Sequence, residues 1–374
     1  MKILIENTVP LNNGDAALIF SVGNELENKG YEIFYSTPQF ELAEDLYPNE
    51  NWILSPTVYR LSRVPFIGTL FLLFYLVKNK KIYTSFDAIV SAPGGYINSY
   101  YTLNNKIKLL SLYKKVFNKK VYIYSQSIGP LNAKDKKLLK KHAEDFDLIY
   151  ARDDISMERL NNLDIKENAV QTKDAAFLFE REDKKELQDK GLKKVAISVR
   201  EWNFDGRDKS TYYNLITNIV TYFYNEGFEV TFLSTCQGIP SYRDDSIIAN
   251  EIFNSLPKNI KERVIVDGQY YNVFELRERL KDYDYVIGTR LHMCILSWLS
   301  SVPAFNISYE EKGKESYEYL KLSKFSIDYN FNSDVYNLLD EFTSETFDDT
   351  YKIIDSINIE SKRNLDFLVN DINS

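Results

Sequence analysis

The sequence predicts an α/β protein of two doubly wound domains, each built on a mainly parallel sheet. Short apolar runs rich in β-branched residues alternate with amphipathic helical stretches along the whole chain. The alternation is interrupted at residues 180–194, which are almost wholly polar and charged and indicate a linker or an exposed helix. The length of 374 residues also favours two domains, because a domain usually has about 100–200 residues.

The first domain is expected to cover residues 1–180 and the second residues 191–374. In the first we expect strands at residues 2–5, 32–35, 88–91, 121–124 and 148–151, and helices at 16–28, 106–118 and 135–143. In the second we expect strands at residues 195–199, 229–233, 264–266, 285–288 and 304–307, and a C-terminal helix that packs back across the domains. Two such domains face each other across a cleft, and ligands of open α/β sheets bind beyond the carboxyl ends of the strands. Functional residues are therefore expected directly after strands.

Composition and charge narrow the class of protein. Two lone cysteines, Cys236 and Cys294, fit a reducing compartment, and the first residues lack the apolar stretch of a signal peptide. We therefore expect a cytoplasmic protein. Residues 60–141 contain 16 basic and 2 acidic side chains, although the whole chain has a net charge of -8. This asymmetry indicates either a solvated lysine-rich surface or an anionic partner, namely nucleic acid, an anionic membrane or a lipid-linked diphosphate.

Residues 64–77 (VPFIGTLFLLFYLV) form a nearly uninterrupted apolar run with basic residues on both sides. The run is too short to span a bilayer, which needs about 20 residues. It predicts either a buried helix or oligomer contact, or a segment that dips into the membrane interface.

Two loops of the first domain carry candidate ligand-binding residues. Residues 12–18 follow the first strand, where Gly14 allows a tight turn. Asp15 either caps the helix that follows or points into the cleft and accepts a proton from a sugar hydroxyl. Gly94 and Gly95 follow another strand and let the backbone approach a ligand closely, although a plain strand-to-helix turn has the same pattern.

A third group of polar side chains, Gln126 and Ser127, ends a further strand of this domain. The polar residues at 150–156 and 173–177 also follow strands, but a capped helix and a tight turn explain them. We interpret these last two segments as structural.

The second domain holds the stronger candidates. Arg200 lies at the end of its first strand, where an isolated arginine needs an anionic partner. Residues 288–292 (GTRLH) place a glycine, an arginine and a histidine at another strand-to-helix junction. His142 lies on a lysine-rich helix face and is interpreted as a bystander, whereas His292 begins an apolar helix and is suited to acid–base chemistry near neutral pH. Lys312 follows the next strand and offers a further cation.

Signatures of metal and nucleotide sites are absent from the sequence. Two histidines and no Cys/His cluster cannot build a zinc site. Neither Gly-x-x-x-x-Gly-Lys-Ser/Thr nor Gly-x-Gly-x-x-Gly occurs. We therefore expect no metal.

The ordered series of motifs resembles the polysaccharide pyruvyl transferase family over roughly residues 2–315. The motifs are residues 13–15 (NGD), 94–95 (GG), 126–130 (QSIGP), 151–153 (ARD), 174–177 (DAAF), 288–292 (GTRLH), 302–303 (VP) and 309–312 (YEEK). The resemblance implies a GT-B-like fold of two Rossmann-like domains. It also implies transfer of pyruvate from phosphoenolpyruvate onto two hydroxyls of a sugar, with formation of a cyclic ketal. The usual run of three glycines is reduced here to Gly94 and Gly95 between a proline and a tyrosine, which leaves the choice of acceptor open.

The resemblance also implies donor-binding and catalytic roles for Arg200, Arg290, Leu291 and His292. Two arginines can clamp the phosphate and the carboxylate of phosphoenolpyruvate through bidentate bonds, and Lys312 adds a cation. We expect His292 to act as general acid and Asp15, as a second hypothesis, to act as base toward the acceptor.

The first domain is expected to bind the acceptor, a sugar or a lipid-linked oligosaccharide. The expected acceptor-binding residues are Asn13, Gly14, Asp15, Gly94, Gly95, Gln126 and Ser127. Docking at the cytoplasmic face of a membrane would then explain the basic stretch 60–141 and the apolar run. We expect no nucleic acid partner and no cofactor, since phosphoenolpyruvate is a co-substrate.

Two alternatives stay open at this point. A nucleotide-sugar glycosyltransferase of the same GT-B architecture would need an acidic ribose ligand in the second domain and would not use phosphoenolpyruvate. A non-catalytic glycan-binding protein would not need Arg290 and His292 together.

Overall fold

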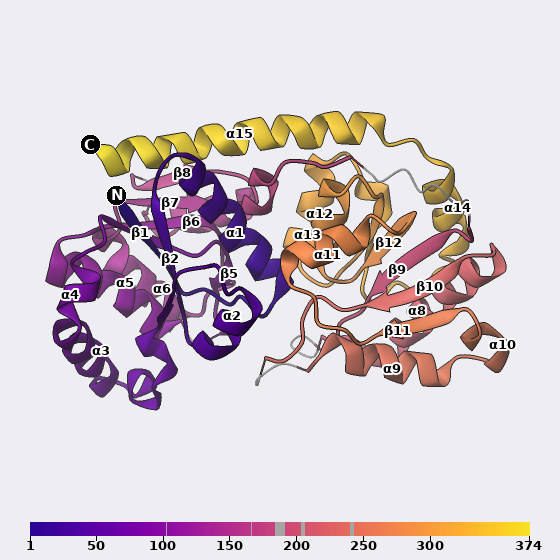
Figure 1. The fold of residues 1–374 in the computed structure, drawn as a ribbon, viewed down its shortest axis with the longest axis horizontal. Coiled ribbons are helices and arrows are strands. Elements are labelled where there is room, and N and C mark those ends of the chain that lie inside the picture. Colours follow the sequence, from indigo (N-terminus) through magenta and orange to yellow (C-terminus); the bar gives the residue numbers. More distant parts are fainter. Residues whose placement is uncertain (102, 166, 184–190, 203–205, 240–242) are drawn as a thin grey trace. The chain divides into compact units, whose positions relative to one another are not determined.

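The computed structural model describes residues 1–101, 103–165, 167–183, 191–202, 206–239 and 243–374 (Figure 1). Part of the expected linker, residues 184–190, lies outside the described residues. The chain forms two compact units. Unit 1 consists of Met1–Pro10, Asp15–Leu178 and Ile359–Ser374, and unit 2 consists of Leu11–Gly14 and Phe179–Asn358. The units depart from the predicted boundaries 1–180 and 191–374 because residues 11–14 join unit 2 and residues 359–374 join unit 1.

The sheet of unit 1 is parallel and has the strand order β3-β2-β1-β4-β6-β7-β8, with β5 paired to β6. Its strands are β1 (Lys2–Glu6), β2 (Glu32–Thr37), β3 (Trp52–Leu54), β4 (Ala88–Ser91), β5 (Gly94–Ile97), β6 (Lys120–Ile128), β7 (Leu148–Ala151) and β8 (Ala169–Gln171). Ile3, Leu4 and Ile5 of β1 are fully buried, as expected for a central parallel strand that is covered on both faces.

Strand β6 is longer than the predicted run at residues 121–124. Its register with β7 shifts between Ile123 and Gln126, and Ser125 at this irregularity has a φ of 47°, which marks a β-bulge. Gln126 and Ser127 therefore lie within the strand, whereas the sequence placed them at its end.

The helices of unit 1 include the three that were predicted, each of which begins two or three residues earlier than expected. They are α1 (Asn13–Asn28), α2 (Phe40–Leu46), α3 (Ile67–Lys78), α4 (Lys80–Tyr83), α5 (Asn104–Phe117), α6 (Ala133–His142) and α7 (Asp154–Asn161). The Gly14 amide donates a hydrogen bond to the Asn12 side chain at 3.1 Å. The interpretation of Asp15 as the cap of α1 is wrong, because Asp15 lies inside the first turn and Asn12 makes the capping bond.

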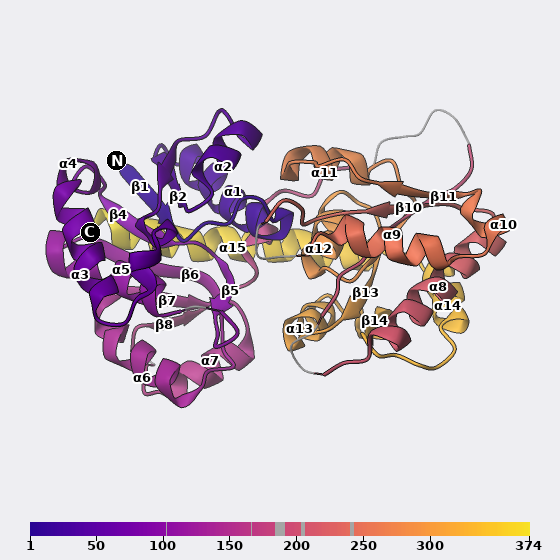
Figure 2. The ribbon, with the colours of Figure 1, turned by 90° about the horizontal axis from the view of Figure 1, so that it is seen from below.

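The sheet of unit 2 is also parallel, with the strand order β11-β10-β9-β12-β13-β14 (Figure 2). Its strands are β9 (Lys194–Ser198), β10 (Glu229–Leu233), β11 (Val264–Asp267), β12 (Tyr285–Gly288), β13 (Ala304–Ser308) and β14 (Ser326–Asp328). Its helices are α8 (Lys209–Asn225), α9 (Asp245–Ser255), α10 (Lys258–Lys261), α11 (Val273–Leu280), α12 (Leu291–Leu299), α13 (Glu311–Tyr319) and α14 (Tyr336–Ser344). Two parallel sheets with helices between their strands confirm the predicted α/β class.

The last helix, α15 (Asp348–Asn373), contributes to both units. In unit 2, Arg181 forms an ion pair with Asp355 at 3.0 Å. In unit 1, Lys29 forms an ion pair with Asp366 at 2.6 Å, and Leu365 is fully buried.

Candidate active site

Three neighbouring strands of unit 2 end at the same edge of the sheet. Gly288 of β12 pairs with Ser198 of β9 on one side and with Asn306 of β13 on the other. Arg200, Arg290 and Tyr309 lie one or two residues beyond the ends of these strands. Because the strands are parallel and in this register, the three segments emerge side by side, where ligands of such sheets bind.

Helix α12 places His292 at this edge. A Cβ at Gly288 would lie 2.3 Å from Sγ of Cys294, so only glycine lets the chain turn into the helix here. Every side chain of α12 is buried except that of His292, which is partly exposed, in a helix that the structure describes completely. The apolar helix thus holds its histidine at the accessible end of a rigid element.

Arg290 caps α12 and forms a buried ion pair with Asp245. One guanidinium nitrogen of Arg290 lies 2.6 Å from Oδ1 of Asp245, and Nε lies 3.3 Å from Oδ2. The Asp245 carboxylate also accepts a hydrogen bond from the Cys236 amide at 3.1 Å. Burial on its own would lower the pKa of Arg290, but the Asp245 carboxylate raises it above its ordinary value. The arginine is therefore a fixed cation with N–H donors beyond the two that Asp245 receives.

Arg200 lies beside two aromatic rings that pack against each other with their centroids 4.5 Å apart. Its guanidinium carbon is 4.6 Å from the centroid of Tyr309 and 5.0 Å from that of Trp202, and it donates a hydrogen bond to the Tyr309 hydroxyl. Its amide donates to the hydroxyl of Tyr212 at 3.1 Å. Cation–π contacts of this kind hold the planar guanidinium in one orientation.

Tyr309 links the three predicted cations. Burial raises the pKa of the Tyr309 phenol, and the charges of Arg200, Lys312 and Arg290 act in the opposite direction. All three cations are thus close enough to one buried phenol to act on it electrostatically. The structure therefore brings the two arginines and the lysine together around Tyr309.

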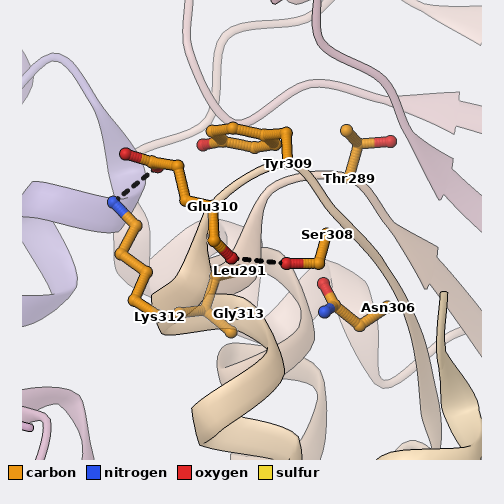
Figure 3. Close-up of a pocket in the computed structure, with 8 residues that line it drawn as sticks. All are labelled: Thr289, Leu291, Asn306, Ser308, Tyr309, Glu310, Lys312 and Gly313. Atoms are coloured by element: carbon orange, nitrogen blue, oxygen red, sulfur yellow. Dashed lines mark hydrogen bonds and ion pairs between the residues drawn. The ribbon is translucent and has the colours of Figure 1, made fainter. Parts of the chain in front are cut away.

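A pocket opens beside these residues (Figure 3). Its volume is about 170 Å³, part of it open to solvent, and it is lined by Thr289, Leu291, Asn306, Ser308, Tyr309, Glu310, Lys312 and Gly313. In Figure 3 the Lys312 amino group points to the Glu310 carboxylate, at 2.8 Å. An anion in the pocket would therefore share Lys312 with Glu310.

The pocket lies at the first turns of α12 and α13, since Leu291 begins α12 and Lys312 is the second residue of α13. Helix N-termini carry partial positive charge and unpaired N–H groups. A Cβ at Gly313 would lie 2.4 Å from Oγ of Ser308, so glycine keeps the wall of the pocket close-packed. Two helix ends and nearby cations suit a small anion.

Among the described residues, no group of three His, Cys, Asp or Glu side chains could hold a metal ion.

The first residues of α1 reach this site. The Asn13 amide donates to the Thr235 carbonyl at 2.9 Å, and its side chain donates to the Tyr271 carbonyl at 2.9 Å. A Cβ at Gly14 would lie 2.8 Å from Nδ1 of His292. Asn13 and Gly14, predicted to bind the acceptor, therefore belong to unit 2 and lie beside the histidine.

The other acceptor candidates lie in unit 1. Gly94 has a φ of 144°, which favours glycine, and a Cβ there would lie 3.7 Å from Oδ1 of Asp15. Gly95 follows in β5. Lys106 of α5 lies over the ring of Tyr96, with Nζ 4.4 Å from the centroid. Burial lowers the pKa of Lys106 to about 8, while the charge of Asp15 raises it. This group thus combines Asp15, the glycine pair and a lysine.

Gln126 and Ser127 differ in their hydrogen bonding. Gln126 is fully buried, and its Oε1 has no hydrogen-bond partner. Ser127 donates to the Asp153 carboxylate and accepts from Arg152 at 2.8 Å. Ser127 is therefore part of a polar network that includes Asp153, one of the residues interpreted as structural.

The profile of the polysaccharide pyruvyl transferase family matches residues 12–311. The chain belongs to this family. The match includes every predicted site residue except Lys312. It confirms the resemblance that the motif series gave.

A curated relative is similar along most of the chain. The amylovoran biosynthesis protein AmsJ of Erwinia amylovora is 28% identical over 272 residues, which are 68% of this chain and 63% of AmsJ. The aligned part of the chain thus spans less than two thirds of the relative's length.

Several solved structures resemble the chain in fold. A glycosyltransferase from Rickettsia africae has a TM-score of 0.65 at 11% identity, with 100% of this chain and 98% of that chain covered. The UDP-GlcNAc 2-epimerase from Neisseria meningitidis has a TM-score of 0.62 at 10% identity, with 99% and 100% covered. Anabaena Alr3699/HepE has a TM-score of 0.61 at 11% identity, with 98% and 99% covered. These likenesses confirm the GT-B-like fold and say nothing of substrate.

Several residues of the site were not found from the sequence. Asp245 lies in a polar stretch without a motif, and only the fold brings it to Arg290. Tyr309 belonged to the motif at residues 309–312 but received no role. Lys106 has no local pattern that separates it from the other lysines of the basic stretch.

Proposed function

We propose that this protein transfers the pyruvate group of phosphoenolpyruvate to two hydroxyls of a sugar in a polysaccharide precursor, forming a ketal and releasing phosphate. The convergence of Arg200, Arg290 and Lys312 around Tyr309 carries the proposal. Phosphoenolpyruvate presents a phosphate and a carboxylate, and a site with several fixed cations can bind both groups at once.

The reaction divides into two balanced steps. In the first, a proton adds to the methylene carbon of phosphoenolpyruvate, and one sugar hydroxyl bonds to C2 and loses its proton. In the second, the other hydroxyl bonds to C2 and loses its proton, the C2–O bond to phosphate breaks, and the departing phosphate takes up that proton. The products are the ketal and inorganic phosphate, and no electrons are exchanged. The reaction therefore needs no redox cofactor.

His292 is proposed to deliver the proton to the methylene carbon. Its ring is partly exposed at the start of α12 and lies against Gly14, and histidine can carry a transferable proton near neutral pH. Arg290 and Arg200 are proposed to bind the donor and to stabilise the charge on departing phosphate.

Asp15 is proposed as the base toward the acceptor, with Gly94, Gly95 and Gln126 beside it in unit 1. The buried Oε1 of Gln126 without a partner supports a polar ligand there, because such atoms are rare in folded proteins.

We further propose a sugar carried on a lipid diphosphate as the acceptor, and the cytoplasm as the place of reaction. Cys236 and Cys294 are both buried thiols rather than disulfide partners, which fits a reducing compartment.

The test measures phosphate released from phosphoenolpyruvate in the presence of a panel of glycan acceptors, with the ketal methyl group followed by NMR. Wild-type protein should release phosphate only with a matching acceptor. His292→Ala should abolish turnover and leave part of the donor binding measured by calorimetry. His142→Gln, at the other histidine, should retain turnover.

Two results would overturn the proposal. One is full activity of His292→Ala. The other is consumption of a nucleotide sugar, with no phosphate released from phosphoenolpyruvate by any acceptor, which would indicate a glycosyltransferase.

A further inference from the structure

Helix α3 has one buried and one exposed apolar face. Gly68, Leu72 and Leu76 are buried, and α5 lies between α3 and the sheet of unit 1 (Figures 1 and 2). On the other side, Leu70 is 67% exposed and Phe74 65% exposed. A surface helix of a soluble domain normally presents polar residues on this side.

The exposed face continues beyond these two residues. Ile67 is 54% and Val77 49% exposed, and Phe66, directly before the helix, is 88% exposed. Phe66 also has a φ of 61°, a conformation that bulky residues rarely adopt. We define the α3 surface as the side chains of Phe66, Ile67, Leu70, Phe74 and Val77.

Exposed cations flank the α3 surface at both ends. Arg60 and Arg63 precede it, and Lys78, Lys80 and Lys81 follow it. Residues 51–86 contain no Asp or Glu. The apolar surface therefore has a basic rim without local carboxylates to neutralise it.

This combination favours an anionic lipid bilayer over other occupants. A second copy of the chain would bring two basic rims together, and like charges repel. Lipid supplies both an apolar interior and anionic head groups, each basic residue near an anionic surface adding roughly fivefold to binding. Among the described residues, none of the helices has the length and apolar character needed to cross a bilayer, so contact would be confined to the interface.

We propose that the α3 surface docks in the interface of an anionic membrane, with Phe66, Leu70 and Phe74 among the acyl chains and the basic rim among the head groups. This attachment is independent of the reaction at the active site. It would bring the enzyme to acceptors that are themselves held in a membrane.

The test is co-sedimentation of the full chain with phosphatidylglycerol vesicles and with phosphatidylcholine vesicles. Binding to phosphatidylglycerol should be at least tenfold tighter at low salt and should weaken as salt rises. Replacing Phe66, Leu70 and Phe74 together with Ser should weaken it by at least tenfold. Phe367→Ser, which changes a side chain that is 62% exposed on α15, should have no effect. Replacing Lys78, Lys80 and Lys81 together with Gln should weaken binding and flatten its salt dependence.

A fluorescence readout keeps the test valid if the triple Ser variant fails to fold. Cys236 and Cys294 are buried, so a dye should label Phe74→Cys selectively. Its emission should shift to the blue with phosphatidylglycerol vesicles, whereas that of a labelled Phe367→Cys control should not.

Three outcomes would overturn the inference. They are failure of the wild type to bind phosphatidylglycerol at low salt, binding that the triple Ser variant retains, and a dimer that this variant loses in place of lipid binding.

Discussion

Gly14 lies directly against His292, since a Cβ on residue 14 would be 2.8 Å from Nδ1 and 3.1 Å from Cβ of the histidine. The residue before it, Asn13, is fixed to the Thr235 carbonyl. The start of α1 thus forms one wall around the proposed general acid. Its glycine is explained by this close approach, whereas the sequence explained it by a tight turn.

We expect Gly14→Ala to lower kcat by about 10- to 100-fold, because a shift of about 1 Å in a catalytic group can cost that much. The affinity for phosphoenolpyruvate should change much less, since the arginines stay in place. Steady-state kinetics and calorimetry measure the two effects. Gly268→Ala is the control, because a Cβ there meets nothing within 4 Å. An unchanged kcat would show that Gly14 does not position the histidine.

Asp245→Asn should lower the free energy of unfolding by about 3 kcal/mol, because it leaves a buried arginine without its charged partner. The double variant Asp245→Asn/Arg290→Gln should be less destabilised than the two single effects added together. Urea denaturation measures each value. The exposed ion pair of Asp349 with Lys352 provides the control, and Asp349→Asn should leave stability nearly unchanged. Strict additivity would contradict the coupling of Asp245 to Arg290.

Arg200→Lys should raise the KM for phosphoenolpyruvate by about tenfold or more, although the charge is kept. A lysine lacks the planar guanidinium that packs against Trp202 and Tyr309, and it cannot make bidentate bonds to an anion. Tyr309→Phe keeps the ring and removes the hydroxyl that accepts from Arg200, so its effect should be smaller. Initial rates at several donor concentrations distinguish the two variants. A larger effect for Tyr309→Phe would indicate a direct role of the hydroxyl.

Lys106→Met should raise the free energy of unfolding by about 1–2 kcal/mol at pH 7 while reducing turnover. Burial lowers the pKa of Lys106 to about 8 from 10.5. The charged lysine therefore lowers the free energy of unfolding of the wild type, and this destabilisation is fully present below pH 8. Between pH 8 and 10.5 the folded state releases the proton before the unfolded state does, and wild-type stability rises relative to the variant.

The difference in free energy of unfolding between Lys106→Met and wild type should therefore be smaller at pH 9 than at pH 7. Urea denaturation at both pH values measures this difference. Lys108→Met on the same helix is the control for turnover. If Lys106→Met is less stable than wild type at pH 7, the charge of Lys106 stabilises the fold. The idea that the protein gives up stability to keep this lysine for turnover would then be wrong.

Residues that follow strands were predictable from the sequence, because parallel strands deliver their carboxyl ends to one edge of a sheet. This rule identified four site residues, namely Arg200, Arg290, His292 and Lys312. Asp245 was not, since its pairing with Arg290 depends on how α9 returns to that edge.

The position of the helix cap and of the bulge could not be predicted either. Asn12 and Asp15 are both good capping residues, and only the backbone decides between them. The bulge at Ser125 extends β6 through Gln126 and Ser127 by a change of register that leaves no mark in the apolar pattern.

The contribution of α15 to unit 1 has a consequence for synthesis of the protein. Leu365 and Leu368 are fully buried in a unit that otherwise ends at Leu178. During translation, domains generally fold from the N-terminus onward, but here unit 1 cannot bury these leucines until residues 359–374 have left the ribosome. A nascent chain stalled before that point would expose part of the unit 1 core to chaperones, and a fragment ending near residue 180 would do so permanently.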